Sequence, residues 1–253
     1  MSLFRERLYI STTASDADDL AGKYDLGLEI AEFCTASNLD LCFSKTDARV
    51  REHLSCAGRF TFHAPFNELC PAAIDPLVRE LTARRYRQAI VQALRYGIKK
   101  IVIHTGFIPI VYYPEWFIPR SVEFWTEFLA GCTDDVEICL ENVMEPDPAM
   151  LCGIVSGVDD PRLRICLDVG HANAALSHAP VTEWAERVCP WLSHVHIHDN
   201  DGKTDQHRPL GQGSIELKTV LDIIETNCGH ATYAVENITA AESVDWLRRN
   251  GYM

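Results

Sequence analysis

The sequence predicts a closed (β/α)8 barrel, and three observations support this fold class. The chain has 253 residues, a length typical of single α/β barrels. Short β-rich runs alternate with amphipathic helical patterns from one end of the chain to the other. No low-complexity linker interrupts this alternation, so we expect a single barrel domain over residues 1–253.

The expected strands are short runs rich in β-branched and apolar residues, as strands usually are. An open doubly wound sheet is the alternative architecture, but no GxGxxG motif follows the first run to support a dinucleotide-binding fold. The eight expected strands cover residues 7–12, 26–33, 60–66, 100–106, 137–143, 164–170, 192–199 and 233–238.

Three of the intervening segments have clear helical patterns. In residues 76–97 the apolar residues recur at steps of three and four, and the segment ends on Gly97. Residues 119–131 and 214–229 each have a serine near the start and a glycine at the end, as helices favour.

Composition restricts the partners and the compartment. A formal net charge of −13 disfavours general binding to nucleic acid or to an anionic membrane. The ten cysteines are scattered without a CxxC pair, and the first residues form no apolar signal segment. No apolar run reaches membrane-spanning length. We therefore expect a cytoplasmic protein with free thiols.

Six consecutive expected strands each carry one metal-capable side chain near the C-terminal end. In a barrel these ends meet at one mouth, where catalytic residues lie. Because side chains alternate along a strand, the residues two positions earlier should form a packed layer beneath the site. Histidine and carboxylate together are ligands of zinc and manganese, so a metal site is predicted. The six residues are His63, His104, Glu141, Asp168, His196 and Glu236.

Three further ligand candidates lie in loops near these ends. His171 follows Asp168 in the segment DVGH, and a tight turn would return its side chain to the same site. Asp205 and His207 are separated by one residue, so in extended backbone both side chains point the same way. His198, two residues after the strand-seven ligand, is expected either behind the ligands or in contact with substrate.

The segments FHAPF, IHTG, LEN, LDVGHAN, HIHD, DQHRPLGQGSI and VEN together resemble the xylose-isomerase-like TIM-barrel superfamily. That superfamily includes sugar and sugar phosphate isomerases and epimerases, and the endonuclease-IV-type apurinic endonucleases. The resemblance implies one to three divalent cations, Zn²⁺ or Mn²⁺. Epimerases of this type hold one metal through four side chains, which match Glu141, Asp168, His196 and Glu236. The endonucleases bind three zinc ions through nine, which match His63, His104, Glu141, Asp168, His171, His196, Asp205, His207 and Glu236.

Two reactions follow from this resemblance. In an isomerase or epimerase acting on a sugar or sugar phosphate, Glu141 and Glu236 would remove and return a proton through an enediolate. In a phosphodiesterase acting on abasic DNA, two or three metals would clamp the phosphate. The net charge, a shorter loop after His196 and the lack of basic residues in the rim loops favour the isomerase. A non-catalytic binding barrel is a third, less favoured hypothesis.

Substrate contacts are expected from Phe66, Trp116 and His198. The endonuclease pattern has tyrosine at the position of Phe66 and asparagine at that of His198. Trp116 belongs to the segment 105–117, whose aromatic residues would form an apolar lid or else pack against a helix. Neither mechanism uses the two glutamates of the second strand, Glu29 and Glu32; we expect one to face the barrel and the other the helices.

Overall fold

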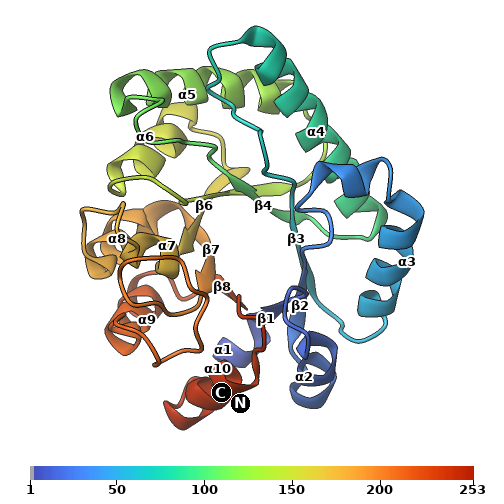
Figure 1. Cartoon of the computed structure of the whole chain (residues 1–253), viewed down its shortest axis with the longest axis vertical. Coiled ribbons are helices and arrows are strands. Elements are labelled where there is room, and N and C mark those ends of the chain that lie inside the picture. Colours follow the sequence, from blue (N-terminus) through green and yellow to red (C-terminus); the bar gives the residue numbers. More distant parts are fainter. Residues whose placement is uncertain (1–2) are drawn as a thin grey trace.

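The computed structural model describes residues 3–253 and contains the predicted barrel (Figure 1). Its strands are all parallel and close into a ring in chain order, with the last strand hydrogen-bonded to the first. The strands are β1 (Leu8–Ser11), β2 (Gly27–Ile30), β3 (Phe60–His63), β4 (Lys100–His104), β5 (Glu137–Glu141), β6 (Leu163–Asp168), β7 (Leu192–Ile197) and β8 (Thr232–Val235).

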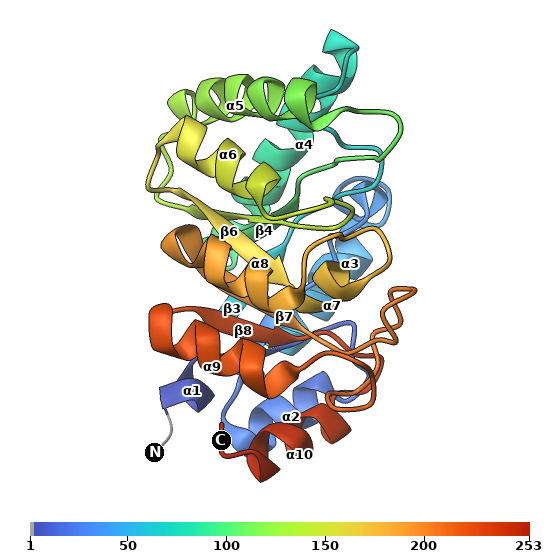
Figure 2. The same ribbon diagram turned by 90° about the vertical axis from the view of Figure 1, so that its left-hand side faces the viewer.

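Helices surround the ring of strands, and the two chain ends lie near each other (Figure 1, Figure 2). Every helix within residues 3–253 is either too short or too polar to span a lipid bilayer. The helices are α1 (Leu3–Glu6), α2 (Ala17–Tyr24), η1 (Ala36–Leu39), α3 (Phe43–Leu54), α4 (Pro76–Arg95), α5 (Pro114–Ala130), α6 (Ala149–Val158), α7 (Val169–Asn173), α8 (Val181–Val188), η2 (Cys189–Trp191), α9 (Leu217–Asn227) and α10 (Ala241–Arg249).

The strands are apolar because both of their faces are covered. In β4, Ile101 and Ile103 are fully buried in the main core of the protein. Val102 points to the other side and packs with Cys139 and Cys166 in a separate buried cluster. This cluster is part of the layer that side-chain alternation predicts beneath the site. The two cysteines fill space there, as buried thiols commonly do.

The pairing register brings the polar strand ends to one level. His104 pairs with Glu141 across β4 and β5, and Asp168 pairs with His196 across β6 and β7. Each strand ends at or just after its polar residue, so the observed strands are shorter than the expected ones. The polar side chains therefore lie at the C-terminal mouth of the barrel, as predicted.

Helix α5 begins earlier than the sequence pattern suggested. It starts at Pro114 rather than at residue 119, because proline at the first helical position has its φ angle already set and needs no amide hydrogen bond. Pro119 lies inside the helix, and Ser121 is buried within it. The expectation that a serine marks the start of this helix was wrong, whereas Gly131 does follow its end.

The loop between β7 and α9 is held by the buried carboxylate of Asp199. In Figure 2 this loop projects at the right-hand side of the barrel. A Cβ atom at Gly213 would collide with the side chain of Asp199 and with the backbone oxygen of Asn200, so the close approach requires glycine. The carboxylate accepts hydrogen bonds from the amides of Asn200 (2.9 Å) and Ile215 (3.2 Å) at Oδ1, and of Gly211 (3.1 Å) and Gly213 (3.0 Å) at Oδ2.

The two glutamates that follow each other in the β2 region face opposite sides. Glu29 is fully buried inside the barrel. Glu32 faces the helices, where its Oε1 lies 2.8 Å from Nε2 of His53 in α3. His53 Nδ1 also lies 2.6 Å from Oδ1 of Asp18 in α2. Burial opposes the charged ring, but the two carboxylates outweigh it and raise the pKa of His53 above its ordinary value.

Replacing Asp199 with alanine is expected to lower the free energy of unfolding by roughly 2–4 kcal/mol, because four backbone amides lose a charged acceptor. Denaturant unfolding measures the change. Glu216→Ala is the matched control, since Glu216 is an exposed carboxylate of the same loop with no side-chain capping bond. Equal stability of Asp199→Ala and the parent protein would contradict this role for Asp199.

A His53→Gln variant is expected to be less stable than the parent at about pH 6, and to differ less from it at about pH 9. The raised pKa means that the charged ring stabilises the fold fully below its unfolded pKa. This contribution is lost as the pH rises through the higher folded value. Unfolding curves at the two pH values test this, and a difference that stays constant or widens at high pH would refute it.

Candidate metal centre at the mouth of the barrel

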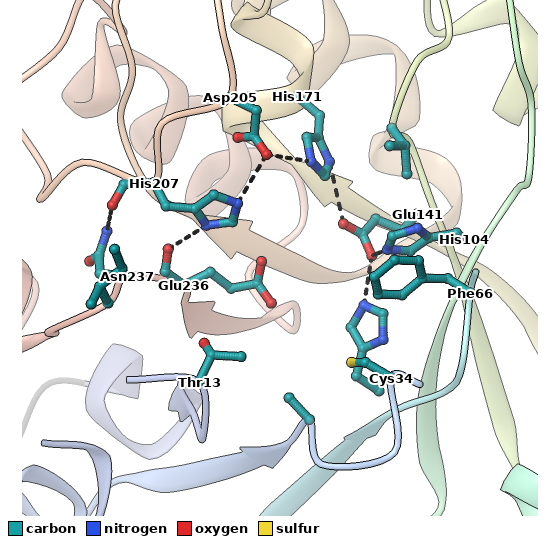
Figure 3. Close-up of a pocket in the computed structure, with 14 residues that line it drawn as sticks. Thr13, Cys34, Phe66, His104, Glu141, His171, Asp205, His207, Glu236 and Asn237 are labelled. Carbon is teal, nitrogen blue, oxygen red and sulfur yellow. Dashed lines mark hydrogen bonds and ion pairs between the residues drawn. The ribbon is translucent and has the colours of Figure 1, made fainter. Parts of the chain in front are cut away.

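Most of the predicted site residues surround one cavity of about 510 Å³ at the C-terminal mouth of the barrel (Figure 3). Asp168 and His196 lie fully buried beside it, in contact with the residues that line it. The predicted residues that line the cavity are His63, Phe66, His104, Glu141, His171, Asp205, His207 and Glu236.

Three carboxylates converge on one nitrogen of His196. Its Nδ1 lies 3.3 Å from Oε1 of Glu141, 3.8 Å from Oδ2 of Asp168 and 3.6 Å from Oε2 of Glu236. This nitrogen is buried and has no hydrogen-bonding partner among residues 3–253. Buried carboxylates this close together require positive charge between them. The four side chains are those that the resemblance assigned to a single metal.

Asp168 is held in place by the turn that follows β6. Its Oδ1 accepts a hydrogen bond from the amide of His171 at 2.7 Å, so the residue caps the short helix α7. The amide of Asp168 donates to Asn142 Oδ1 at 2.9 Å, and Nε2 of His198 lies 3.1 Å from Oδ1 of Asp168. The cap explains the DVGH segment: the turn that it forms brings His171 back to the mouth of the barrel.

Three histidines share one arrangement that suits a metal ligand. In each, Nδ1 lies within hydrogen-bonding distance of a backbone carbonyl oxygen: His63 with Ala64 (2.9 Å), His171 with Asn142 (2.9 Å) and His207 with Glu236 (2.7 Å). A carbonyl oxygen only accepts, so Nδ1 carries the proton and a neutral ring leaves Nε2 bare. Each bare Nε2 faces a carboxylate oxygen.

The Nε2 atoms meet two carboxylates. Nε2 of His63 and Nε2 of His104 both lie 3.2 Å from Oε2 of Glu141. On the other side of the cavity, Oδ2 of Asp205 lies 3.3 Å from Nε2 of His171 and 3.0 Å from Nε2 of His207. Asp205 and His207 therefore approach each other as their spacing predicted. Bare nitrogens beside carboxylate oxygens fit divalent cations of the zinc or manganese type.

The carboxylates and imidazoles shift one another's pKa values in both directions. Burial alone would raise the pKa of Glu141, but His104 and His196 hold it well below its ordinary value. Burial likewise opposes ionisation of Asp168, yet its histidine neighbours lower its pKa to about 2. Glu236 behaves differently, because burial raises its pKa and nearby carboxylates outweigh His196. Positive charge among the ligands is thus what keeps the carboxylates ionised.

The three residues expected to touch substrate lie in different places. Phe66 lines the cavity, and its ring stacks on that of His104 at 4.2 Å between centroids. His198 is fully buried behind Asp168, where its ring stacks on His207 at 3.9 Å. Trp116 is not among the residues that line the cavity. Its ring stacks on Tyr112 at 5.7 Å, so the aromatic segment packs against the start of α5.

Sequence reasoning missed several residues of the site. Thr13, Cys34 and Asn237 line the cavity, but they lie in loops where no pattern marks them. Asn142 was passed over within LEN, although it positions both Asp168 and His171. The signal that could have found Asn142 is its place directly after the strand-five ligand, because the residue after a strand end turns toward its neighbours.

Known proteins resemble this chain in sequence. The uncharacterized protein MJ1311 of Methanocaldococcus jannaschii is 31% identical over 191 residues, which cover 72% of this chain and 65% of that protein. The uncharacterized protein MJ1614 of the same organism is 24% identical over 165 residues, 63% of each chain. This chain therefore matches slightly less than two thirds of the length of these relatives.

Solved structures are similar over almost the whole chain. A D-tagatose 3-epimerase-like protein superposes with a TM-score of 0.78 at 26% identity, covering 96% of this chain and 95% of that one. The TTHB071 protein of Thermus thermophilus, soaked with ZnCl2, gives 0.77 at 25% identity over 98% of both chains. D-psicose 3-epimerase of Clostridium cellulolyticum H10 with D-tagatose shares the fold, with a TM-score of 0.69 at 18% identity over 97% and 92%.

The family assignment rests on most of the chain. A family model described as a xylose isomerase-like TIM barrel matches residues 23–250. The closed barrel and the ligand-type side chains at its mouth agree with that match. This chain belongs to the xylose isomerase-like TIM barrel family.

Proposed function

We propose that this protein is a divalent-metal-dependent isomerase or epimerase that acts on a sugar or sugar phosphate. The observation that carries the proposal is the placement of Glu141 and Glu236. Both face His196 Nδ1, at 3.3 and 3.6 Å, and both line the cavity. The two carboxylates are thus positioned to hold a cation and also to touch a molecule bound in the cavity.

The metal would be held by the four side chains around His196 Nδ1. When bound, a divalent cation supplies positive charge that stabilises negative charge on adjacent substrate oxygens. One of Glu141 and Glu236 removes a proton from the carbon beside a carbonyl group, and the other returns a proton to the enediolate. Asp168 and His196 remain buried beneath the substrate, and Phe66 provides an apolar wall.

Similarity to known proteins supports this function. The D-tagatose 3-epimerase-like protein is 26% identical to this chain over nearly its full length. Zinc is present with two structural neighbours, the TTHB071 protein and the IOLI protein. The first of these neighbours supports carbohydrate chemistry, and the other two support a bound divalent cation.

The charge of the cavity favours a sugar without phosphate over a sugar phosphate. Among the described residues that line the cavity, none is lysine or arginine. Phosphate groups are usually bound by such side chains or by helix N-termini. The formal net charge of −13 adds to the repulsion that a dianionic substrate would meet.

A multinuclear zinc phosphodiesterase acting on abasic DNA is the second candidate. The observation that favours it is the surplus of ligands: His63, His171 and His207 turn bare Nε2 atoms toward carboxylates, although a single metal needs none of them. The acidic charge and the lack of basic side chains in the cavity lining weigh against a polyanionic substrate. A purely binding role is less favoured, because the set of ligand residues is complete.

The purified protein is expected to contain bound divalent metal, because three buried carboxylates face one imidazole nitrogen. Element analysis after saturation with Zn²⁺ or Mn²⁺ and removal of the excess gives the number of cations per chain. A parent protein without metal would contradict the proposed function. His63→Ala should keep the metal count if one cation is bound, whereas loss of a cation would favour the phosphodiesterase. His178→Ala, at an exposed histidine, is the control.

Replacing Glu236 with glutamine is expected to lower kcat by roughly 100- to 10,000-fold, because one of the two proton-transferring groups is lost. Incorporation of solvent deuterium into a panel of ketoses, measured by NMR, follows the reaction. Glu216→Gln, at an exposed carboxylate, should leave the rate unchanged. Efficient incision of an abasic-site oligonucleotide by the parent protein, with no exchange into any sugar, would reverse the ranking of the two functions.

A further inference from the structure

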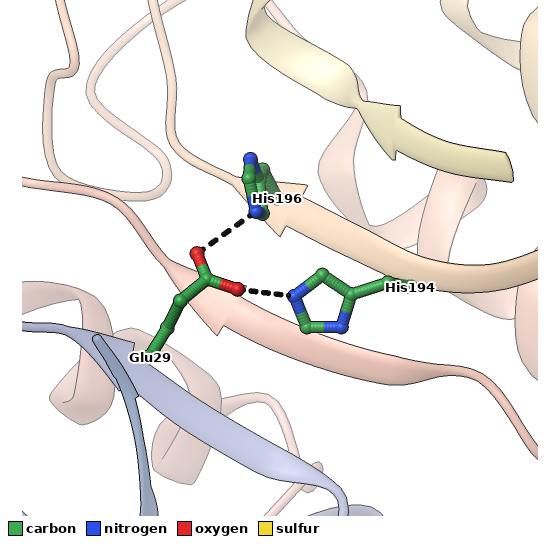
Figure 4. A group of neighbouring side chains, drawn as sticks. All are labelled: Glu29, His194 and His196. Atoms are coloured by element: carbon green, nitrogen blue, oxygen red, sulfur yellow. Dashed lines mark hydrogen bonds and ion pairs between the residues drawn. The ribbon is translucent and has the colours of Figure 1, made fainter. Parts of the chain in front are cut away.

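Glu29 in β2 takes no part in the proposed reaction, yet it lies directly beneath the metal centre. Its side chain is fully buried, as are those of His194 and His196 in β7 (Figure 4). A buried carboxylate is costly unless it is paired with suitable groups. The burial of Glu29 therefore points to a specific role.

Glu29 directs its two oxygens at two different histidines. Oε1 lies 3.0 Å from Nε2 of His196, and Oε2 lies 3.0 Å from Nε2 of His194. Oε2 also accepts a hydrogen bond from Oγ1 of Thr61 at 2.9 Å. Oε1 has no other hydrogen-bonding partner within residues 3–253. The oxygen that faces His196 is thus reserved for that ring.

The other side of His194 completes this arrangement. Its Nδ1 lies 2.6 Å from Oγ1 of Thr232, and Oγ1 of Thr232 accepts a hydrogen bond from Nζ of Lys100 at 3.0 Å. With the threonine hydroxyl donating to Nδ1, His194 carries its proton on Nε2 and donates it to Glu29. Donors from two sides therefore converge on Oε2, which leaves Oε1 as the free acceptor.

The two ring nitrogens of His196 face different surroundings. Nδ1 faces the carboxylates of the metal centre, whereas Nε2 faces only Glu29. A neutral imidazole carries one proton, and a carboxylate can only accept it. A proton on Nε2 is accepted by Glu29 and leaves the lone pair of Nδ1 directed at the metal centre. This is the form of the ring that binds a cation.

We propose that Glu29 is a positioning residue that holds His196 with its proton on Nε2 and its Nδ1 free to bind the metal. The inference rests on the metal centre of the proposed function. A carboxylate behind a ligating histidine fixes the orientation of the ring and makes it a stronger ligand, and loss of such a partner typically costs about 10- to 100-fold in metal affinity. His194 in turn positions Glu29.

The same three side chains could instead hold a second, deeper cation, since their ligand atoms lie within 4.8 Å of one another. The positioning role is favoured for two reasons. Oε2 of Glu29 is already occupied by Thr61 and His194. All three clustered side chains are also fully buried, whereas the other ligands open onto the cavity.

The test compares Glu29→Gln with Glu32→Gln. Glu32 is a matched control, because it is also a shielded carboxylate paired with a histidine, His53, but outside the barrel. Three quantities are measured: the Zn²⁺ affinity of the full chain by chelator competition, the number of cations per chain, and the thermal midpoint of the metal-free protein. In the parent protein loaded with an NMR-active cadmium isotope, coupling to labelled nitrogen identifies the ring atom of His196 that binds the metal.

We expect Glu29→Gln to weaken Zn²⁺ binding by about 10- to 100-fold, and Glu32→Gln to lower the thermal midpoint without changing the affinity. Coupling of cadmium to Nδ1 of His196 supports the proposal even if Glu29→Gln does not fold. Coupling to Nε2, equal affinity of Glu29→Gln and the parent, or one fewer cation in Glu29→Gln would overturn it. A parent protein that binds no metal would instead refute the metal centre itself.

Discussion

The structure at the mouth of the barrel depends on one electrostatic constraint. Glu141, Asp168 and Glu236 are brought around a single imidazole nitrogen in a place shielded from water. Carboxylates in such surroundings repel one another strongly unless positive charge lies between them. No lysine or arginine is found among the described residues of the cavity lining. Protonated histidines or bound cations are therefore the available sources of that charge, and the donor set is suited to cations.

The barrel meets this constraint in successive layers. Strand register sets Asp168 opposite His196 and His104 opposite Glu141, so the ligands share one level. Backbone carbonyl oxygens then fix the ring orientation of the outer histidines, and the Asn142 side chain fixes the backbone around Asp168. Rigid support of this kind reduces the reorganisation needed when a ligand binds. The site is built mainly from main-chain anchors, which the fold itself supplies.

The sequence was sufficient to predict the barrel and the residues that surround the cavity, because alternation along a parallel strand determines which side chains share a face. It could not place Glu29 beneath His196, since that contact joins β2 to β7 across the barrel and no local pattern encodes it. Nor could it place Trp116, because packing against α5 and closing over the cavity require the same apolar residues. Helix α5 was misjudged at its start for a local reason: Pro114 and Ser121 are both acceptable helix-start signals.

The ligands alone do not choose between sugar isomerisation and phosphodiester cleavage, since both reactions use the same residue types. The distinction lies in the remainder of the cavity. Phosphodiester cleavage develops charge on a group that is already anionic, and such sites usually add cationic side chains to the metals. Proton transfer beside a carbonyl group creates one negative charge on a neutral molecule, which a cation and two carboxylates can manage. A cavity lined by Phe66, Cys34 and Ile238 besides its ligands matches the second requirement, and this is why the isomerase is the better supported function.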